Sequence, residues 1–154
     1  MKKFILGTCL AAASTLACAQ SGSNFGVSVA AVNGGIISPG IGIYTPNFEA
    51  GLDGSVLHLS GNNTFSLTGW GGFRRSMANN FFMSLGASVT GVFPSNASNL
   101  YSVSPYIGFD VVNIASAPVL IGAWINPVSW NETSESNNAL WVFGSGGIKF
   151  AYLF

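Results

Sequence analysis

The chain ends in GIKFAYLF (residues 147–154), a stretch in which two kinds of side chain alternate. Ile148, Phe150, Tyr152 and Phe154 share one face of an extended chain, because successive side chains of a strand point to opposite sides. Lys149 lies on the other face. An aliphatic and aromatic face opposite a face that carries a charge predicts a strand between an apolar phase and a narrow polar interior.

The same ending resembles the β-signal of bacterial outer-membrane proteins, in which alternating apolar residues lead to a terminal phenylalanine. All four alternating positions, from Ile148 to Phe154, fit that pattern, and Val142 and Gly144 extend the same face upstream. The resemblance implies that these positions form an assembly signal read by the outer-membrane assembly machinery.

The composition favours membrane strands over membrane helices. Only 6% of the residues are charged and the mean hydropathy is +0.47, whereas about a quarter of the residues of a soluble domain are charged. Downstream of the N-terminus, however, no apolar run reaches the roughly 18 residues of a transmembrane helix. The apolar residues must therefore alternate with others. No basic patch is available for nucleic acid, which excludes it as an expected partner.

The first 19 residues form a predicted secretory signal peptide. Lys2 and Lys3 precede an uncharged apolar stretch (residues 4–17), and small residues at Ala17 and Ala19 suit cleavage after Ala19. Residues 20–154 then form a single domain without cysteine, so no disulfide, thiol nucleophile or cysteine metal site is expected. The alternative is a lipoprotein signal with an acylated Cys18, although threonine stands at position 15 where such signals have leucine.

A spacing of two continues upstream and predicts an all-β fold, an eight-stranded antiparallel up-and-down transmembrane β-barrel. The expected strands cover residues 25–32, 36–45, 48–60, 64–74, 81–93, 101–112, 118–125 and 139–154. One face of each strand is apolar. The other is rich in Gly, Ser and Thr, which suits the narrow interior of an eight-stranded barrel. A secreted β-sandwich or a soluble barrel also alternates, but its outer face would be polar.

Connections and aromatic residues support the same prediction. Short turns are expected over residues 46–47, 75–80 and 113–117, and longer loops at the opposite end. The longest expected loop runs from Asn126 to Asn138, carries Glu132 and Glu135, and is the predicted contact surface for an extracellular ligand. Aromatic residues gather near both ends of the strands, as in the two girdles of a membrane barrel.

Five charged residues fall within the predicted strands, and all have the inward parity: Glu49, Asp53, Arg74, Asp110 and Lys149. If residues 61–62 form a hairpin turn, Glu49 and Arg74 become near cross-strand neighbours. Lone charges inside a barrel are costly, so a charge-paired clamp is the expected arrangement. The alternative is a gate or an ion path through the interior.

His58 and Ser60 form a weak candidate for catalysis. Their spacing is similar to the His-x-Ser motif of lipid A deacylases, which are also small outer-membrane barrels. The match departs from that family, because its motif lies near the C-terminus and continues directly into Asn, whereas Gly61 follows Ser60 here. No acidic residue is evident to orient His58, and as the single histidine it cannot join a multi-histidine metal site. We expect neither a metal nor a cofactor.

The predicted domain as a whole resembles the small eight-stranded outer-membrane barrels of Gram-negative bacteria. The resemblance implies an outer-membrane location, contact with membrane lipid and lipopolysaccharide, and a structural or surface-interaction role without catalysis. Two alternatives stay open: a lipid A-modifying hydrolase that uses His58 and Ser60, and a narrow pore. Bulky Tyr44, Trp70 and Trp124 on the inward face would obstruct a pore.

Overall fold

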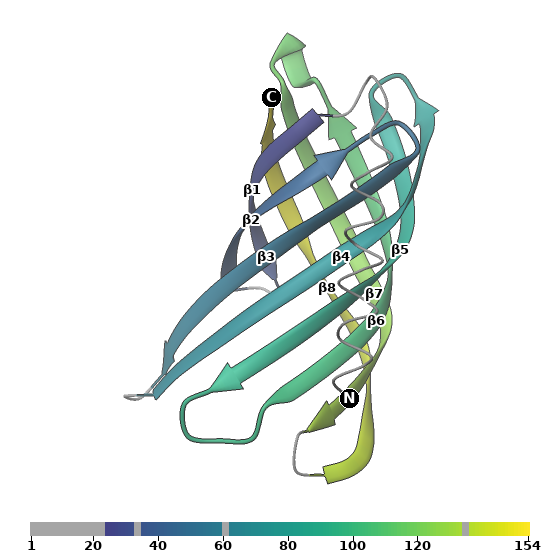
Figure 1. The fold of residues 1–154 in the computed structure, drawn as a ribbon. Coiled ribbons are helices and arrows are strands. Elements are labelled where there is room, and N and C mark those ends of the chain that lie inside the picture. The colour runs from purple at the N-terminus through teal and green to yellow at the C-terminus, as the bar shows by residue number, and fades with distance from the viewer. Residues whose placement is uncertain (1–23, 33–34, 60–61, 134–135) are drawn as a thin grey trace.

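The computed structural model describes residues 24–32, 35–59, 62–133 and 136–154, and within them the chain forms a closed antiparallel β-barrel of eight strands (Figure 1). Each strand pairs with its neighbours in sequence, and β1 also pairs with β8. The predicted all-β fold, a closed antiparallel barrel of eight strands, is confirmed. The predicted signal peptide, with the alternative site at Cys18, lies outside the described residues, as does Ser60.

The eight strands lie where the spacing of two predicts them, with longer β4, β7 and β8. Their bounds are β1 Asn24–Val32, β2 Ile36–Tyr44, β3 Phe48–Leu59, β4 Asn62–Ala78, β5 Phe81–Pro94, β6 Leu100–Val112, β7 Val119–Thr133 and β8 Ser136–Leu153. Strand β4 runs through most of the predicted turn at residues 75–80 and leaves a tight turn, in which Asn80 has a φ of 62°. A short 3-10 helix, Ile114–Ser116, follows β6. No helix in the described part of the chain is long and apolar enough to cross a membrane.

The predicted loop from Asn126 to Asn138 is wrong. Strand β7 continues to Thr133 and β8 begins at Ser136, so most of this segment belongs to a long hairpin. Val128 lies opposite Phe143, and Trp130 lies opposite Trp141. The apolar partners in β8 extend the ladder, and tertiary pairing overrides the polar composition of the segment.

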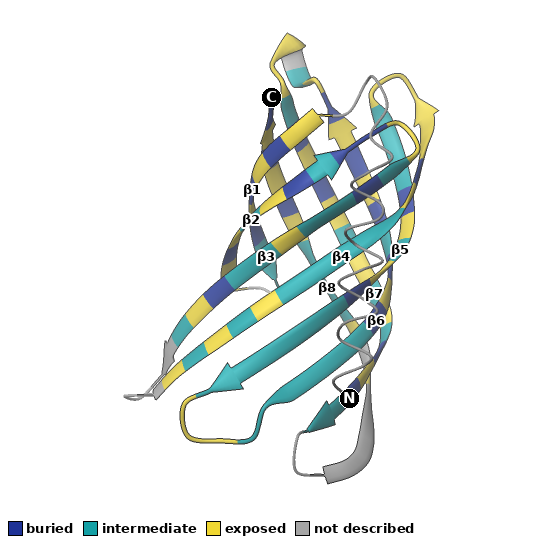
Figure 2. Cartoon of the chain, in the orientation of Figure 1, coloured by how far each residue is buried: buried dark blue, intermediate teal, exposed yellow. Residues whose placement is uncertain are grey.

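Buried and exposed residues alternate along β1 and along much of β6 and β7, whereas most residues of β5 are intermediate (Figure 2). The outward face is apolar, and its exposed residues include Val29, Leu52, Leu85, Ile121 and Phe150. Most of the buried residues are polar or charged, and they include Ser28, Ser84 and Ser104. This barrel is therefore apolar outside and polar inside, which is the reverse of a soluble barrel.

One part of the expected alternation changes at the β7–β8 hairpin. Asn126 and Ser129 both line the interior, three residues apart, and so do Ser145 and Val142. Regular alternation would separate two inward residues by two positions, so β7 and β8 each contain one extra residue at this level. On β8, Gly144 takes a φ of 73° there. The expectation that Val142 extends the outward face of the C-terminal strand is wrong, because this bulge turns it inward.

The two ends of the barrel differ. We call the end where β1 begins and β8 ends the terminal end, and the opposite end the far end. An apolar cluster of five buried residues closes the terminal end, with Trp70 and Phe82 packed against it: Tyr44, Val112, Leu120, Ala151 and Leu153.

Candidate functional site: the barrel interior

Two buried ion pairs lie just above the apolar cluster. Arg74 Nε is 3.3 Å from Asp110 Oδ2, and both side chains are 4% exposed. Lys149 Nζ is 3.9 Å from Glu49 Oε2. The four residues come from β4, β6, β8 and β3, and neither pair joins adjacent strands. The ion pairs therefore link non-adjacent strands across the interior.

Aromatic rings hold the two cations. The Nζ atom of Lys149 lies 4.1 Å from the centre of the Trp70 ring and 4.9 Å from that of Tyr44. The guanidinium carbon of Arg74 lies 3.9 Å from the centre of the Phe82 ring. Such contacts stabilise a desolvated cation by about 2 kcal/mol. The cations are therefore held by ring faces as well as by carboxylates.

Hydrogen bonds fix the carboxylates. The Tyr106 hydroxyl donates to Glu49 Oε1 at 3.0 Å, and the Trp70 indole N–H donates to Asp53 Oδ2 at 2.6 Å. Arg74 also donates from Nη1 to the Thr45 carbonyl oxygen at 3.1 Å. Each of these bonds joins residues on different segments of the barrel wall, so the cluster limits how the wall can move.

The structure places all five predicted charged residues in the interior, but the ion pairs differ from the expected pairing of Glu49 with Arg74. In the register of β3 and β4, Glu49 lies opposite Gly72, two residues from Arg74. Glu49 and Arg74 are thus diagonal neighbours, but their ion-pair partners are Lys149 and Asp110. Asp53 lies closer to the far end, where it accepts the hydrogen bond from Trp70.

Glycines provide the space for the interior aromatic rings. A Cβ atom on Gly86 would lie 2.6 Å from the Tyr106 ring, and one on Gly147 would lie 2.6 Å from the Trp124 ring. Trp70 packs in the same way over Gly51. Sequence reasoning counted glycines as small inward residues and did not connect them with these rings. It also missed Tyr106, although its parity on β6 is that of Asp110 and Ser104.

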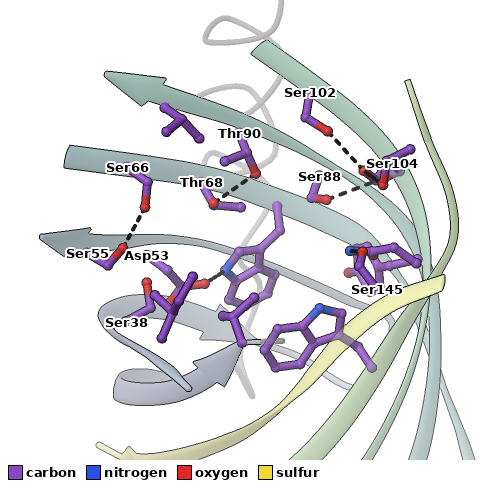
Figure 3. A pocket seen from close by; sticks show the side chains of 18 of the residues that line it. Ser38, Asp53, Ser55, Ser66, Thr68, Ser88, Thr90, Ser102, Ser104 and Ser145 are labelled. Atoms are coloured by element: carbon purple, nitrogen blue, oxygen red, sulfur yellow. Dashed lines mark hydrogen bonds between the residues drawn. The ribbon is translucent and has the colours of Figure 1, made fainter. Parts of the chain in front are cut away.

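Between the ion pairs and the far end, the interior contains a cavity of about 320 Å³, and most of the polar residues that line it carry hydroxyl groups (Figure 3). Several hydroxyls pair across adjacent strands, including Ser55 with Ser66 at 2.6 Å and Thr68 with Thr90 at 2.9 Å. Apolar side chains such as Leu100 line the cavity at the far end, and Trp70 and Trp124 lie deeper. The interior therefore has a closed terminal end and, toward the far end, a cavity lined by both hydroxyl groups and apolar side chains.

The catalytic candidate stays a prediction. The backbone of His58 belongs to β3 and lies opposite Asn63, but its side chain and all of Ser60 are outside the described part of the chain. Within the residues that are described, no group of three or more His, Cys, Asp or Glu residues could hold a metal ion.

The predicted assembly signal lies on the outward face of β8 and on the residue that follows it, and all four of its residues are exposed: Ile148, Phe150, Tyr152 and Phe154. The Phe154 N–H donates to the Phe25 carbonyl oxygen at 2.7 Å, and the two rings lie 6.4 Å apart. The last residue therefore joins the first and last strands at the closure of the barrel.

Comparison of the chain with protein-family models, curated proteins and solved structures finds no match.

Proposed function

We propose that this protein is an integral β-barrel of the bacterial outer membrane with a structural or surface-interaction role and no catalysis. The observation that carries the proposal is the inverted polarity of the barrel. Apolar side chains such as Val29, Leu52 and Ile121 are about half exposed on the outside, while serine, threonine and charged side chains lie inside. Exposing so many large apolar groups to water would favour aggregation, whereas lipid accommodates them.

The distribution of aromatic rings supports the same proposal. Phe25 contacts Phe154 at the terminal end, and Phe81 stacks on Phe109 nearby. Toward the far end, Phe93 contacts both Phe65 and Tyr101 at ring distances of 6.1 Å. Two such groups suit the interfaces of an apolar band about 25 Å tall. Even the shortest strands have nine residues, enough to cross a bilayer at the usual tilt.

The interior favours an anchor over a channel. The apolar cluster around Tyr44, Leu120 and Leu153 closes the terminal end, and the ion pairs brace the wall above it. A continuous water path would have to cross both layers. The proposed partners are therefore membrane lipid and lipopolysaccharide along the outside, with the β7–β8 hairpin as the contact surface for a ligand at the far end.

Refolding into phosphatidylcholine vesicles tests the proposal. The mature chain should float with the vesicles and migrate differently in SDS gels with and without boiling. Leu52→Lys should lower the folded fraction, because a lysine at mid-height of the lipid face costs about 2–4 kcal/mol. The matched control is Ser95→Lys in the β5–β6 connection, which should insert normally.

Two outcomes would overturn parts of the proposal. A soluble chain that ignores vesicles and tolerates Leu52→Lys would exclude a membrane barrel. Stepwise conductance in planar bilayers would exclude the role of a closed anchor while leaving the membrane location intact.

A further inference from the structure

Among the residues whose side chains the structure describes, the barrel interior holds one more carboxylate than cations. The carboxylates are Glu49, Asp53 and Asp110, and the cations are Arg74 and Lys149. Arg74 pairs with Asp110, and Lys149 pairs with Glu49. Asp53 forms no ion pair in the described part of the chain, and Lys149, which attracts it from a greater distance, is shared with Glu49. Asp53 is therefore the carboxylate whose charge is least balanced.

The carboxylate of Asp53 is nevertheless held in one position. The Trp70 indole N–H donates to its Oδ2 atom at 2.6 Å, and the Ser28 hydroxyl donates to Oδ1 at 3.5 Å. Gly40, opposite Asp53 on β2, provides space for the carboxylate, because a Cβ atom at this position would collide with it. An ionised carboxylate can accept about four hydrogen bonds, so the group keeps the capacity for a further donor.

The side chain of Asp53 lines the interior cavity, on the same side as Ser55 of β3 and Ser38 of β2 (Figure 3). The lining continues to far-end residues of three other strands: Thr64 on β4, Val92 on β5 and Leu100, the first residue of β6. The ion pairs and the apolar cluster lie on the opposite, terminal side. The cavity therefore connects Asp53 with the far end of the barrel.

The other lining residues determine which cation fits the cavity. The hydroxyls of Ser38 and Ser55 can accept hydrogen bonds from an ammonium group. Apolar side chains also line the space, Leu57 and Leu100 among them, and the Trp124 indole offers a ring, which attracts cations to its face. A ligand of this cavity therefore combines a positive charge with an apolar part.

Metal ions and anions fit the cavity less well. Ca²⁺ takes roughly six to eight oxygen ligands, and in the described residues no group of three or more His, Cys, Asp or Glu could hold a metal ion. An anion would meet an interior that carries an excess of one negative charge and whose two cations are already paired. An organic cation balances this excess and also uses the apolar part of the wall.

We infer that the interior cavity binds a small organic monocation, an ammonium group on a short apolar body, with Asp53 as its counter-ion. The ammonium group lies against the carboxylate and the neighbouring hydroxyls, and the apolar body points toward Leu57 and Leu100. A cavity of about 320 Å³ is at the lower end of ligand pockets, so the body is limited to about the size of one aromatic ring. The inference goes beyond the proposed structural role and does not depend on the membrane location.

Calorimetric titration of the refolded mature chain in neutral maltoside micelles tests the inference. Phenethylammonium, the probe, should saturate at one molecule per barrel. Phenylethanol and phenylacetate have the same ring without the positive charge, and their dissociation constants should be at least about tenfold higher, because a hydrogen bond to a charged group is lost. Methylammonium, which lacks the apolar body, should also bind more weakly than phenethylammonium.

A charge variant and a matched control locate the bound cation. Asp53→Asn keeps an acceptor for the Trp70 N–H and removes the charge, so the dissociation constant of phenethylammonium should rise at least about tenfold. Arg75→Gln, at an exposed residue of β4, also changes the net charge by one unit. It should leave the dissociation constant within about twofold, because solvent screens an exposed charge.

A second variant keeps the test decisive if Asp53→Asn loses its heat-modifiable migration. Thr68 lies opposite Asp53 in the register of β3 and β4 and lines the cavity. Thr68→Lys places an ammonium group of the chain itself next to the carboxylate and should abolish binding of the probe. If neither variant folds, the comparison of phenethylammonium with phenylethanol in the parent chain decides.

Two results would overturn the inference: phenylethanol that binds as tightly as phenethylammonium, which a protonated Asp53 would also produce, or an Asp53→Asn variant that binds the probe like the parent chain. Equal binding of methylammonium would overturn the part assigned to the apolar wall. A chain that binds phenethylammonium but does not float with vesicles would overturn the membrane location alone.

Discussion

Removing one partner of the Arg74–Asp110 ion pair should destabilise the barrel strongly. Arg74→Met removes the guanidinium that lies 3.3 Å from Asp110, donates to the Thr45 carbonyl and packs on Phe82. Asp110, only 4% exposed on its side chain, then keeps a buried charge without its ion-pair partner. Such a loss costs about 3–5 kcal/mol. With an m-value of about 1–3 kcal/mol per molar urea, the midpoint of unfolding should fall by roughly 1–5 M.

Urea unfolding of the refolded protein in vesicles, followed by tryptophan fluorescence, measures this effect. Arg75→Met is the matched control, since Arg75 is the next residue on β4 and is exposed. Its free energy of unfolding should change by no more than about 0.5 kcal/mol. The double variant Arg74→Met/Asp110→Asn should recover much of the loss, because it leaves no unpaired charge at this position.

Two results would refute the reasoning. If Arg74→Met is as stable as Arg75→Met, the ion pair does not hold the wall together. If the double variant is no more stable than the single one, the loss comes from packing around Phe82 and the unpaired carboxylate is not its cause.

Three further predictions concern packing, assembly and catalysis. Gly86→Ala should lower the free energy of unfolding by about 1–3 kcal/mol, because its Cβ would meet Tyr106 and Gly72, while Gly54→Ala, with no atom nearer than 3.6 Å, should be close to neutral; equal effects would contradict tight seating of the ring. Deleting Phe154 should reduce the heat-modifiable fraction in isolated outer membranes, because it removes the bond to Phe25; an unchanged fraction would count against an assembly signal. His58→Ala should leave the acyl pattern of lipid A unchanged in mass spectra, and a changed pattern would favour the hydrolase.

The strands and their faces could be predicted from the sequence wherever one face of a strand points outward and the other inward along its whole length. From β1 to β6, the spacing of two continues except for one irregularity between Ser76 and Ala78 at the end of β4, so parity alone identifies Ser28, Ser84 and Asp110 as inward residues. The β7–β8 hairpin differs for two physical reasons. Its polar segment suggested a loop, although pairing with β8 makes it a strand. A bulge near Gly144 then reverses the parity, and nothing in the alternation up to Ser145 announces it.

Parity also identifies the charged residues of the interior without identifying their partners. Cross-strand reasoning brings Glu49 near Arg74, because β3 and β4 are adjacent. The observed partners come from non-adjacent strands, since strand tilt and side-chain length decide which groups meet across a narrow interior. Strand length, the alternation of inward and outward residues, and the positions of the hairpins determine which residues are neighbours along the wall. Contacts across the interior depend instead on how the whole barrel closes.

The choice between a clamp and a gate follows from what lies beneath the ion pairs. A gate opens when charged side chains exchange partners, and the path behind them must then be free. Here Tyr44 contacts Lys149 from the terminal end and packs with Leu120 and Leu153 in the apolar cluster, where Leu120 is fully buried. Exchange of the ion pairs would leave that closure in place. The charges therefore brace the wall above a closed terminal end, and the interior cavity lies between them and the far end.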